Sequence, residues 1–348
     1  MSVPVAVVGA SGYAGAELVR ILSGHPKARL AALAGDSTAG QRFDALYPAA
    51  RGLVDLTLEA FDPAALAKKA ELVLLAVPHG QGMKMAPPLL EAGLKVVDLS
   101  ADFRLKDPIL YEKWYKHPHS AIELLKEAVY GLPEVNRKLV AKARLVANPG
   151  CYPTSIILAL LPLLAEGLVD VDSLIADSKS GVSGAGNKAT PGNHFGSAGE
   201  NFSAYKVAGT HQHIPEIEQA LGLAAKQELR LTFTPHLLPV MRGIFTTAYA
   251  DLVEEGTSSK KLTALYKDFY KGERFVRVCE DSLPDLKSVK GSNFCDIAPR
   301  VDERTGRAVV MACEDNLGKG AAGQAVQNMN LMLGFPEDAG MEGMAFTL

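Results

Sequence analysis

The chain has 348 residues, 36 Lys and Arg against 39 Asp and Glu, and a hydrophobic content of 48%. Such a composition is typical of a globular chain with two domains, and the absence of a basic cluster argues against nucleic acid or a membrane surface as partner. The four cysteines form no CxxC pair, and the amino terminus has no basic leader before its first apolar run. We expect a cytoplasmic protein with free thiols, no metal site and a small-molecule substrate.

Short apolar runs alternate with helix-period segments through the first 150 residues. The runs predicted to be strands are residues 3–9, 28–35, 71–78, 94–100 and 143–150. Strands that alternate with helices in this way indicate βαβ units and a parallel sheet.

From about residue 168 the pattern changes to longer alternating runs. These lie at 228–252, 275–280, 295–301 and 308–314. They predict a mostly antiparallel sheet. The last helical segment, 320–335, has the apolar period of a packing helix and could return to the first domain.

The predicted fold class is therefore α/β, with two domains. A Rossmann-type nucleotide-binding domain comprises residues 1–150 and 315–348, and an α+β catalytic and dimerisation domain with a mostly antiparallel sheet comprises 151–314.

The first strand runs into "GASGYAGAELVRIL", which places glycines at Gly9, Gly12 and Gly15. Glycines between a strand and a helix permit a tight turn and bring a pyrophosphate to the helix N-terminus, whose N–H groups and dipole favour anions. The turn residues that we expect to bind a dinucleotide are Gly9, Ser11, Gly12, Tyr13, Ala14 and Gly15.

The second strand ends in "LAGDSTAGQR", where the adenosine ribose would be recognised. Asp36 could accept a hydrogen bond from a 2'-hydroxyl and favour NAD. Ser37, Thr38 and Arg42 could instead hold the 2'-phosphate of NADP. The residues leave both cofactors open.

"VANPGCYPTSIILALL" places Cys151 between a strand end and an apolar helix. Pro153 suits the first helical turn, and Thr154 and Ser155 could cap it. A thiol at a helix N-terminus has its thiolate stabilised by the dipole and the N–H groups. We expect Cys151 to be a nucleophile, the alternative being a buried structural cysteine.

A thiolate nucleophile needs a group that exchanges protons. "GTHQHIPEIEQ" places His211 and His213 two residues apart, before a helix that begins near Pro215. His213, at the helix boundary, is our first choice for the general acid/base and His211 the second. Glu216, in the first turn, could orient an imidazole or bind substrate. The alternative is that both histidines satisfy backbone groups.

Two further segments suit an anionic substrate. "DSKSGVSGAGNKATPG", residues 177–192, follows a short strand, and the backbone N–H groups of its Ser and Gly run could face an anion. "DLSADFRL" places Arg104 just past a strand end of the first domain, where ligands of parallel sheets bind. Either could be a simple loop, and Arg104 could form a surface ion pair.

Taken in order, "GASGYAGAELVRIL", "DLSADFR", "YGLPEVNR", "NPGCYPTS", "SGVSGAG", "HQHIPEIEQ", "PHLLPVMRGI" and "NLGKGAAGQAVQNMN" resemble the N-acetyl-gamma-glutamyl-phosphate reductase family of arginine biosynthesis, relatives of aspartate-semialdehyde dehydrogenase. The resemblance extends over nearly the whole chain.

The resemblance implies reduction of N-acetyl-L-glutamyl 5-phosphate to N-acetyl-L-glutamate 5-semialdehyde. Cys151 would attack the acyl phosphate to form a thioester, hydride from NADPH would reduce it, and His213 would exchange protons beside Glu216. It also implies a homodimer or homotetramer. By resemblance, Arg104 would hold substrate, the loop of residues 180–186 would line the nicotinamide and phosphate region, and Asn316 would complete the cofactor site. The candidate substrate contacts are therefore Arg104, Asn148 and Ser180, and the further candidate cofactor contacts are Ser37, Ser183, Gly184 and Asn316.

The sequence allows other cofactors, substrates and functions. NAD(H) remains the alternative cofactor, because Asp36 would repel the 2'-phosphate of NADP. The substrate could instead be the aminoadipyl phosphate of lysine biosynthesis on a carrier protein, although no basic run marks a carrier surface. The protein could also be a nucleotide-binding regulator without catalysis, in which Cys151 would be unreactive. A cysteine hydrolase is a third alternative, but it would give the glycine-rich turn no function.

Overall fold

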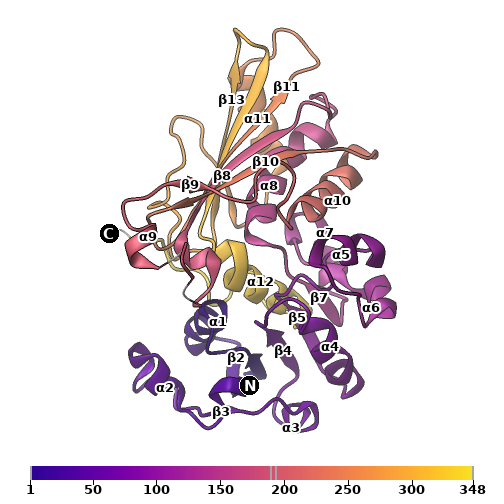
Figure 1. Cartoon of the computed structure of the whole chain (residues 1–348). Coiled ribbons are helices and arrows are strands. Elements are labelled where there is room, and N and C mark those ends of the chain that lie inside the picture. Colours follow the sequence, from indigo (N-terminus) through magenta and orange to yellow (C-terminus); the bar gives the residue numbers. More distant parts are fainter. Residues whose placement is uncertain (1, 189, 193, 347–348) are drawn as a thin grey trace. The chain divides into compact units, whose positions relative to one another are not determined.

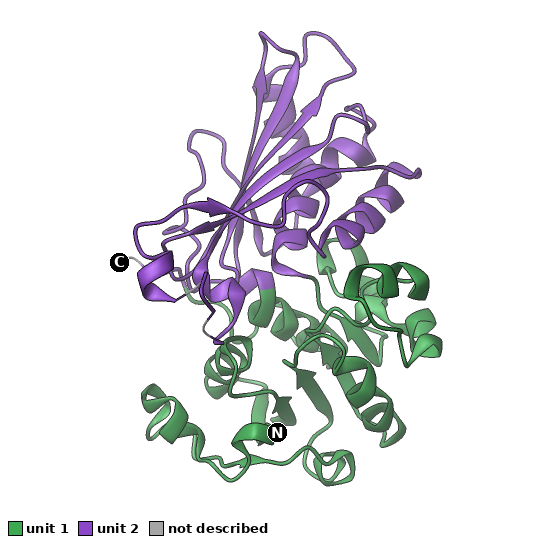
Figure 2. Ribbon diagram, in the orientation of Figure 1, with its two compact units in different colours: residues 1–149, 321–343 green, residues 150–320, 344–348 purple. Residues whose placement is uncertain are grey.

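Within residues 2–188, 190–192 and 194–346, which the computed structural model describes, the chain forms two seven-stranded sheets (Figure 1). Each sheet belongs to its own unit (Figure 2). Residues 1–149 and 321–343 make up the first unit, and residues 150–320 and 344–348 the second.

The first unit has an entirely parallel sheet with strand order β3-β2-β1-β4-β5-β7-β6. Its strands are β1 (Val3–Val8), β2 (Ala28–Ala34), β3 (Leu58–Glu59), β4 (Leu72–Leu75), β5 (Lys95–Asp98), β6 (Val129–Tyr130) and β7 (Leu145–Ala147). Its helices are α1 (Tyr13–Ser23), α2 (Phe43–Leu46), α3 (Pro63–Ala67), α4 (Gly82–Glu91), α5 (Pro108–Tyr115), α6 (Ile122–Glu127), α7 (Pro133–Val140) and α12 (Gly323–Met332).

This sheet is buried because helices cover it. The β4 sequence LVLL is buried at every position, as expected for a strand with helices on both faces. Helices α1 and α12 pack on each other, α1 on β1 and β2, and α12 and α4 on β5. The strand order reverses between β1 and β4, so the carboxyl ends of these two strands mark the crevice where doubly wound sheets bind ligands.

The second unit has a mixed sheet with order β12-β13-β14-β11-β8-β10-β9. Its strands are β8 (Ile175–Gly181), β9 (Ser203–Ala204), β10 (Thr232–Leu238), β11 (Ile244–Asp251), β12 (Val276–Val278), β13 (Cys295–Asp302) and β14 (Arg307–Glu314). Its helices are α8 (Cys151–Ala165), α9 (Phe195–Ala198), α10 (Ile214–Ala225) and α11 (Ser259–Phe269), and a π-helical turn, Gly318–Ala322, leads out of it.

Helix α8 is the core of the second unit. It packs against β11, β13 and β14 and contacts α10 and α11. Every residue from Tyr152 to Leu164 is buried, which explains why this helix is apolar on all sides. β11 alternates buried and half-buried residues along its length, so one face of the sheet lies against α8 and the other is more open.

The predicted fold class is confirmed: a parallel Rossmann-type sheet is followed by a second, mostly antiparallel one. The five predicted strands of the first unit correspond to β1, β2, β4, β5 and β7. In the second sheet, β8 pairs in parallel with β10 and β12 with β13, so that sheet is mixed.

Candidate active site

The turn between β1 and α1 forms a cradle that only glycine can build. Gly9 has a φ of 83°, and a Cβ there would lie 2.1 Å from the carbonyl oxygen of Ala76. A Cβ at Gly15 would lie 2.2 Å from the Gly9 carbonyl oxygen. Helix α1 begins without a side-chain cap among the described residues and without an acidic residue in its first turn. This end of the helix therefore fits an anionic pyrophosphate.

The remaining residues predicted for the dinucleotide lie in the same turn. The Gly12 N–H donates to the Gly9 carbonyl at 3.2 Å, and the Tyr47 hydroxyl donates to the Ser11 carbonyl at 2.7 Å. Tyr13 is exposed, and Ala14 is half-buried. The structure brings these residues together, and their contact with a cofactor stays a prediction.

The segment after β2 holds the residues predicted to distinguish NAD from NADP. Asp36 and Ser37 are exposed in one turn of 3-10 helix, and an oxygen of Asp36 accepts from the Phe61 N–H at 3.3 Å. Arg42 is paired with Asp44 at 2.9 Å and with Asp55 at 2.7 Å. The guanidinium is therefore already occupied by two carboxylates.

At the carboxyl ends of β5 and β7, Arg104 and Asn148 are buried rather than on the surface. The Arg104 Nε donates to the Asn148 carbonyl and its Nη2 to the Leu99 carbonyl, both at 2.8 Å. The Asn148 side chain accepts from Asn328 at 3.0 Å and donates to the Ala321 carbonyl at 3.1 Å. Backbone groups thus fix the guanidinium. The substrate-binding roles of both residues stay predictions.

Two buried carboxylates in the same segment were not identified from the sequence. Asp102 accepts from the N–H groups of Gly80 and Met83 at 2.8 and 2.9 Å and from the Tyr111 hydroxyl at 2.7 Å, which ties the loop after β4 to the loop after β5. Burial and the neighbouring charge of Asp102 raise the pKa of Asp98 to about 7. The signal available in the sequence was the pair of aspartates in "DLSADFR".

Cys151 is the first residue of α8 and is partly accessible. The N–H of the preceding residue, Gly150, donates to a carboxylate oxygen of Glu216 at 2.8 Å. The expectation that Thr154 and Ser155 cap the helix is wrong. Their hydroxyls donate to backbone carbonyls in the first turn, and no side-chain cap from the helix's own N-cap residue is present in the described structure. Glu216, from α10, supplies the acceptor instead.

The two predicted histidines lie together at the start of α10. Their ring centroids are 4.8 Å apart, and the backbone N–H of His213 donates to Nδ1 of the His211 ring at 3.1 Å. Both rings pack edge-on against Tyr152, the residue after the predicted nucleophile, with centroids 5.6 and 6.0 Å from it. Burial, and then the charge of Lys206, lowers the pKa of His211 to about 3. His211 is therefore neutral at pH 7, and His213 is only half-buried.

A tyrosine pair beside Cys151 was also missed. The Tyr205 hydroxyl donates to the Tyr152 hydroxyl at 3.0 Å, and Tyr152 donates to the His236 carbonyl at 3.2 Å. Burial raises the pKa of Tyr205 to about 12, and the charge of Cys151 acts in the same direction. A tyrosine six residues before His211 carries no spacing signal, because it reaches the site through the fold of the intervening loop.

Within the predicted segment 177–192, of which residue 189 lies outside the described residues, the first glycine-rich turn does not offer an open set of N–H groups to an anion. The N–H groups of Gly181, Val182 and Ser183 donate to backbone carbonyls of residues 243, 240 and 241. Those amides are therefore engaged within the second unit. Ser180, which is buried, donates to the Gly181 carbonyl at 3.1 Å. Gly184 lies beside it, since a Cβ there would be 2.9 Å from the Ser180 hydroxyl.

Asn316 connects this loop to Gly243, the residue before β11. Its amide nitrogen donates to the Ser183 hydroxyl at 2.9 Å, and its oxygen accepts from the Gly243 N–H at 2.7 Å. The structure therefore brings together two residues predicted to contact the cofactor, Ser183 and Asn316, although 133 positions separate them.

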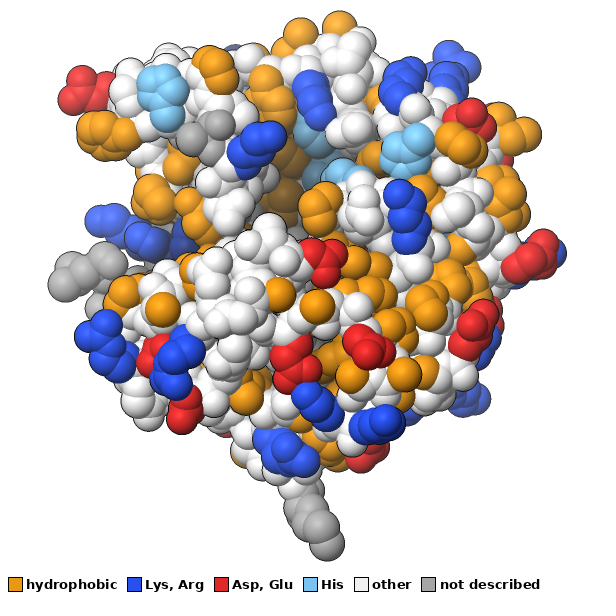
Figure 3. All heavy atoms as spheres, turned by 60° about the horizontal axis from the view of Figure 1, so that its bottom comes forward, with side chains coloured by type: hydrophobic (Ala, Val, Ile, Leu, Met, Phe, Trp, Pro, Cys, Tyr) orange, Lys and Arg blue, Asp and Glu red, His pale blue; other side chains and the backbone are white. Residues whose placement is uncertain are grey.

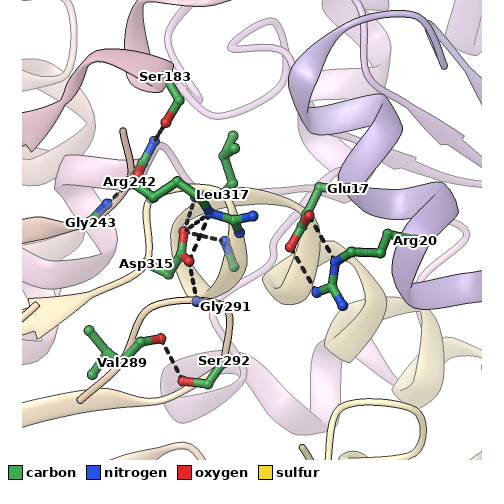
Figure 4. Close-up of polar contacts among 12 residues, drawn as sticks. Glu17, Arg20, Ser183, Arg242, Gly243, Val289, Gly291, Ser292, Asp315 and Leu317 are labelled. Carbon is green, nitrogen blue, oxygen red and sulfur yellow. Dashed lines mark hydrogen bonds and ion pairs between the residues drawn. The ribbon is translucent and has the colours of Figure 1, made fainter. Parts of the chain in front are cut away.

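The neighbouring residue, Asp315, organises a second set of contacts that sequence reasoning missed (Figure 4). It is fully buried, pairs with Arg242 at 3.0 Å, and accepts from the N–H groups of Gly291 and Leu317 at 2.5 and 2.9 Å. The arginine of "PHLLPVMRGI" is therefore held in place by a buried carboxylate.

Comparison with known proteins identifies the family. The family model described as semialdehyde dehydrogenase, NAD binding domain, matches residues 4–143, and the semialdehyde dehydrogenase dimerisation domain matches 151–316. A protein of Syntrophobacter fumaroxidans named N-acetyl-gamma-glutamyl-phosphate reductase is 54% identical over 97% of each chain. One of the same name from Pelotomaculum thermopropionicum is 54% identical over 99% of each chain.

The chain belongs to the N-acetyl-gamma-glutamyl-phosphate reductase family. The family predicted from the sequence is thereby confirmed, and the protein is an oxidoreductase that uses a nicotinamide dinucleotide. Solved structures show the same fold. Aspartate semialdehyde dehydrogenase II of Vibrio cholerae superposes with a TM-score of 0.73 at 18% identity, covering 96% of this chain and 99% of that one. The Candida albicans enzyme with NADP superposes with a TM-score of 0.70 at 15% identity over the same shares.

Charges of both signs are mixed on one face of the molecule. On the face shown in Figure 3, Lys and Arg are interspersed with Asp, Glu and apolar side chains. Among the described residues, helices long and apolar enough to cross a membrane are not found, and no group of three or more His, Cys, Asp or Glu is arranged to hold a metal ion.

Proposed function

We propose that the protein reduces N-acetyl-L-glutamyl 5-phosphate to N-acetyl-L-glutamate 5-semialdehyde in arginine biosynthesis, with Cys151 as the nucleophile. The names of relatives that are 54% identical over nearly the whole chain support the substrate. The observation that carries the chemistry is the position of Cys151 as the first residue of a buried 15-residue helix, with its preceding amide held by Glu216.

In this reaction the helix N-terminus stabilises the thiolate of Cys151, which attacks the acyl carbon. A bond forms between sulfur and that carbon, the bond from the carbon to the phosphate oxygen breaks, and phosphate leaves with the electron pair. A thioester accepts hydride more readily than a carboxylate and remains attached to the enzyme. The bound nicotinamide dinucleotide supplies the hydride.

His213 then acts on the tetrahedral adduct, whose oxygen must be protonated at one stage and deprotonated when the carbon–sulfur bond breaks. That bond breaks with its electron pair returning to sulfur, which regenerates the thiolate and releases the aldehyde. The partial exposure of His213, and its place beside the neutral His211, support His213 as the group that exchanges this proton. Glu216 positions the nucleophile through Gly150.

The glycine cradle before α1 fits a dinucleotide pyrophosphate, and we assign NADP(H) as the cofactor. Ser37 is exposed at the end of β2, where it could donate to a 2'-phosphate. Asp36 is drawn toward the Phe61 N–H, which reduces its repulsion of that phosphate. Arg42 would need to leave its two carboxylate partners before it could take part.

The same proposal includes a homodimer or homotetramer in the cytoplasm. The family description of residues 151–316 as a dimerisation domain supports self-association, as does the half-buried face of β11. Light scattering on the purified protein measures the mass directly. A monomer at all concentrations would contradict this part of the proposal.

The test of the function is phosphate-dependent reduction of NADP, and separately of NAD, by N-acetylglutamate semialdehyde at alkaline pH. We expect turnover with the native protein, a higher kcat/KM with NADP, and none with Cys151→Ser. Native protein that folds but does not turn over would refute the substrate. The carrier-linked aminoadipyl compound would then be assayed next.

A further inference from the structure

The buried carboxylate of Glu314 lies close to the predicted nucleophile, Cys151, and has no role in the proposed reaction. Glu314 is the last residue of β14, in the interior of the sheet between β11 and β13, and its side chain is fully buried. A buried carboxylate is costly unless its charge is compensated, so its presence beside a reactive thiol calls for a functional explanation.

The carboxylate of Glu314 and the side chain of Cys151 both lie next to Gly320. A Cβ at Gly320 would lie 2.9 Å from the Cβ of Cys151 and 3.1 Å from Oε1 of Glu314. Both atoms therefore lie closer than ordinary van der Waals contact to the one point that a Cβ at residue 320 would take, so Cys151 and Glu314 approach each other across Gly320. No side chain occupies that point, because residue 320 is glycine.

A buried cation accompanies the carboxylate. Lys319 is also fully buried, and its Nζ lies 5.7 Å from the centre of the Phe275 ring. Burial is the main reason that the pKa of the Cys295 thiol is raised; the charge of Glu314 raises it further, and the charge of Lys319 lowers it. Both charged groups therefore lie near Cys295, where Lys319 acts against Glu314.

We propose that Glu314 is a positioning residue for the nucleophile, and that its carboxylate, compensated by Lys319, limits the fraction of Cys151 present as thiolate. The proposal rests on Cys151 being the nucleophile. Near Cys151 the helix N-terminus favours the thiolate, and the carboxylate opposes it through the low-dielectric interior. The other described titratable groups that the contacts and charges place around Cys151, Glu314 and their neighbours include Tyr152, Tyr205, His211, His213, Glu216, Cys295, Asp296, Cys313 and Asp315.

This balance suits a thiol that must act twice. A more acidic thiol gives more thiolate but a weaker nucleophile, and a less acidic one leaves the tetrahedral adduct more slowly. A carboxylate that opposes the helix N-terminus keeps the thiol near the pH at which it works, where attack and expulsion are both efficient.

The test is the rate at which iodoacetamide alkylates Cys151 in the full-length protein, measured by peptide mass spectrometry between pH 5 and pH 10. We expect Glu314→Gln, which keeps the shape and removes the charge, to lower the midpoint by about one pH unit. At low pH this gives about tenfold more thiolate, and about threefold faster alkylation once the weaker nucleophilicity is included. At high pH, where all of the thiol is ionised, the same variant should react about threefold more slowly.

Opposite changes at the two ends of the pH range distinguish tuning from loosened packing, which would alter both rates in the same direction. Asp296→Asn is the control, because it removes a buried carboxylate of β13 that pairs with Arg277. It should leave the midpoint unchanged. A midpoint in Glu314→Gln equal to the native one would overturn the proposal.

If Glu314→Gln fails to fold, the native protein still decides. A midpoint below about pH 7.5, as for a thiol at an unopposed helix N-terminus, would refute the proposal, and a midpoint at or above about 7.5 would support it. A native Cys151 that is not alkylated at any pH would instead contradict its role as nucleophile. The two failures are thus distinguishable.

Discussion

Replacing Glu216 tests how the nucleophile is held. Its carboxylate is 1% exposed and accepts from the Gly150 N–H at 2.8 Å, so Glu216→Ala leaves a buried amide without this acceptor. A hydrogen bond to a charged group contributes about 1.5–3 kcal/mol. We expect Glu216→Ala to lower the free energy of unfolding by about 2–3 kcal/mol. Glu216→Gln, which keeps an amide oxygen, should lose about 1 kcal/mol.

The same change should reduce catalysis, because Gly150 immediately precedes Cys151. A small displacement of a reacting group can cost about 100-fold in rate, so we expect kcat to fall at least tenfold in Glu216→Gln. Unfolding in urea and initial rates with saturating substrate measure the two effects separately.

Glu218 is a matched control on the same helix. Its carboxylate also accepts from a backbone amide, that of Leu231 at 3.1 Å, but this bond does not involve the segment of the nucleophile. Glu218→Gln should cost a similar amount of stability and leave kcat unchanged. Native kcat in Glu216→Gln, together with a stability loss below about 0.5 kcal/mol in Glu216→Ala, would refute the assignment of Glu216 as a positioning residue.

Two further predictions concern the first unit. In Gly15→Ala the new Cβ would lie 2.2 Å from a backbone oxygen, so we expect the free energy of unfolding to fall by about 1–3 kcal/mol and the dinucleotide to bind more weakly. Gly24→Ala is the control, because its Cβ would meet nothing within 4 Å. A fluorescence titration should show normal dinucleotide binding by this control. Because the native state keeps Asp98 protonated between its unfolded pKa of 3.8 and about 7, stability should fall as the pH rises through that interval. Asp98→Asn should therefore be more stable than the native protein at pH 8, by up to ~4 kcal/mol, and lose this advantage near pH 4. Urea midpoints that respond identically to pH in both proteins would contradict the raised pKa.

The strands predicted from the sequence are those with a hydrophobic run long enough to recognise. The strands that were missed are too short for such a run and exist only because they pair with a neighbouring strand. β1, β2, β4, β5 and β7 are apolar runs that any window detects. β3 and β6 have only two residues each and pair with one neighbour at an end of the sheet. A two-residue strand has no periodicity of its own, so its existence depends on the strand beside it.

Strand order in the second sheet was likewise beyond local patterns. β10 and β11 follow each other closely in the chain, but β8 lies between them, parallel to β10 and antiparallel to β11. This pairing is what brings Gly181, Val182 and Ser183 against the segment that joins β10 to β11 and engages the amides that the glycine-rich loop was expected to offer an anion.

The two histidines illustrate what burial adds to a motif. In the sequence His211 and His213 are nearly equivalent candidates for the same proton. The structure makes them different: His211 is 7% exposed, burial lowers its pKa to about 3, and its Nδ1 already accepts the His213 N–H. An imidazole that resists protonation at neutral pH cannot serve as the proton donor. It can hold the start of α10 rigid, and so fix the backbone of His213. We therefore predict that His211 positions the start of α10 and that His213 exchanges the proton, because burial keeps His211 neutral.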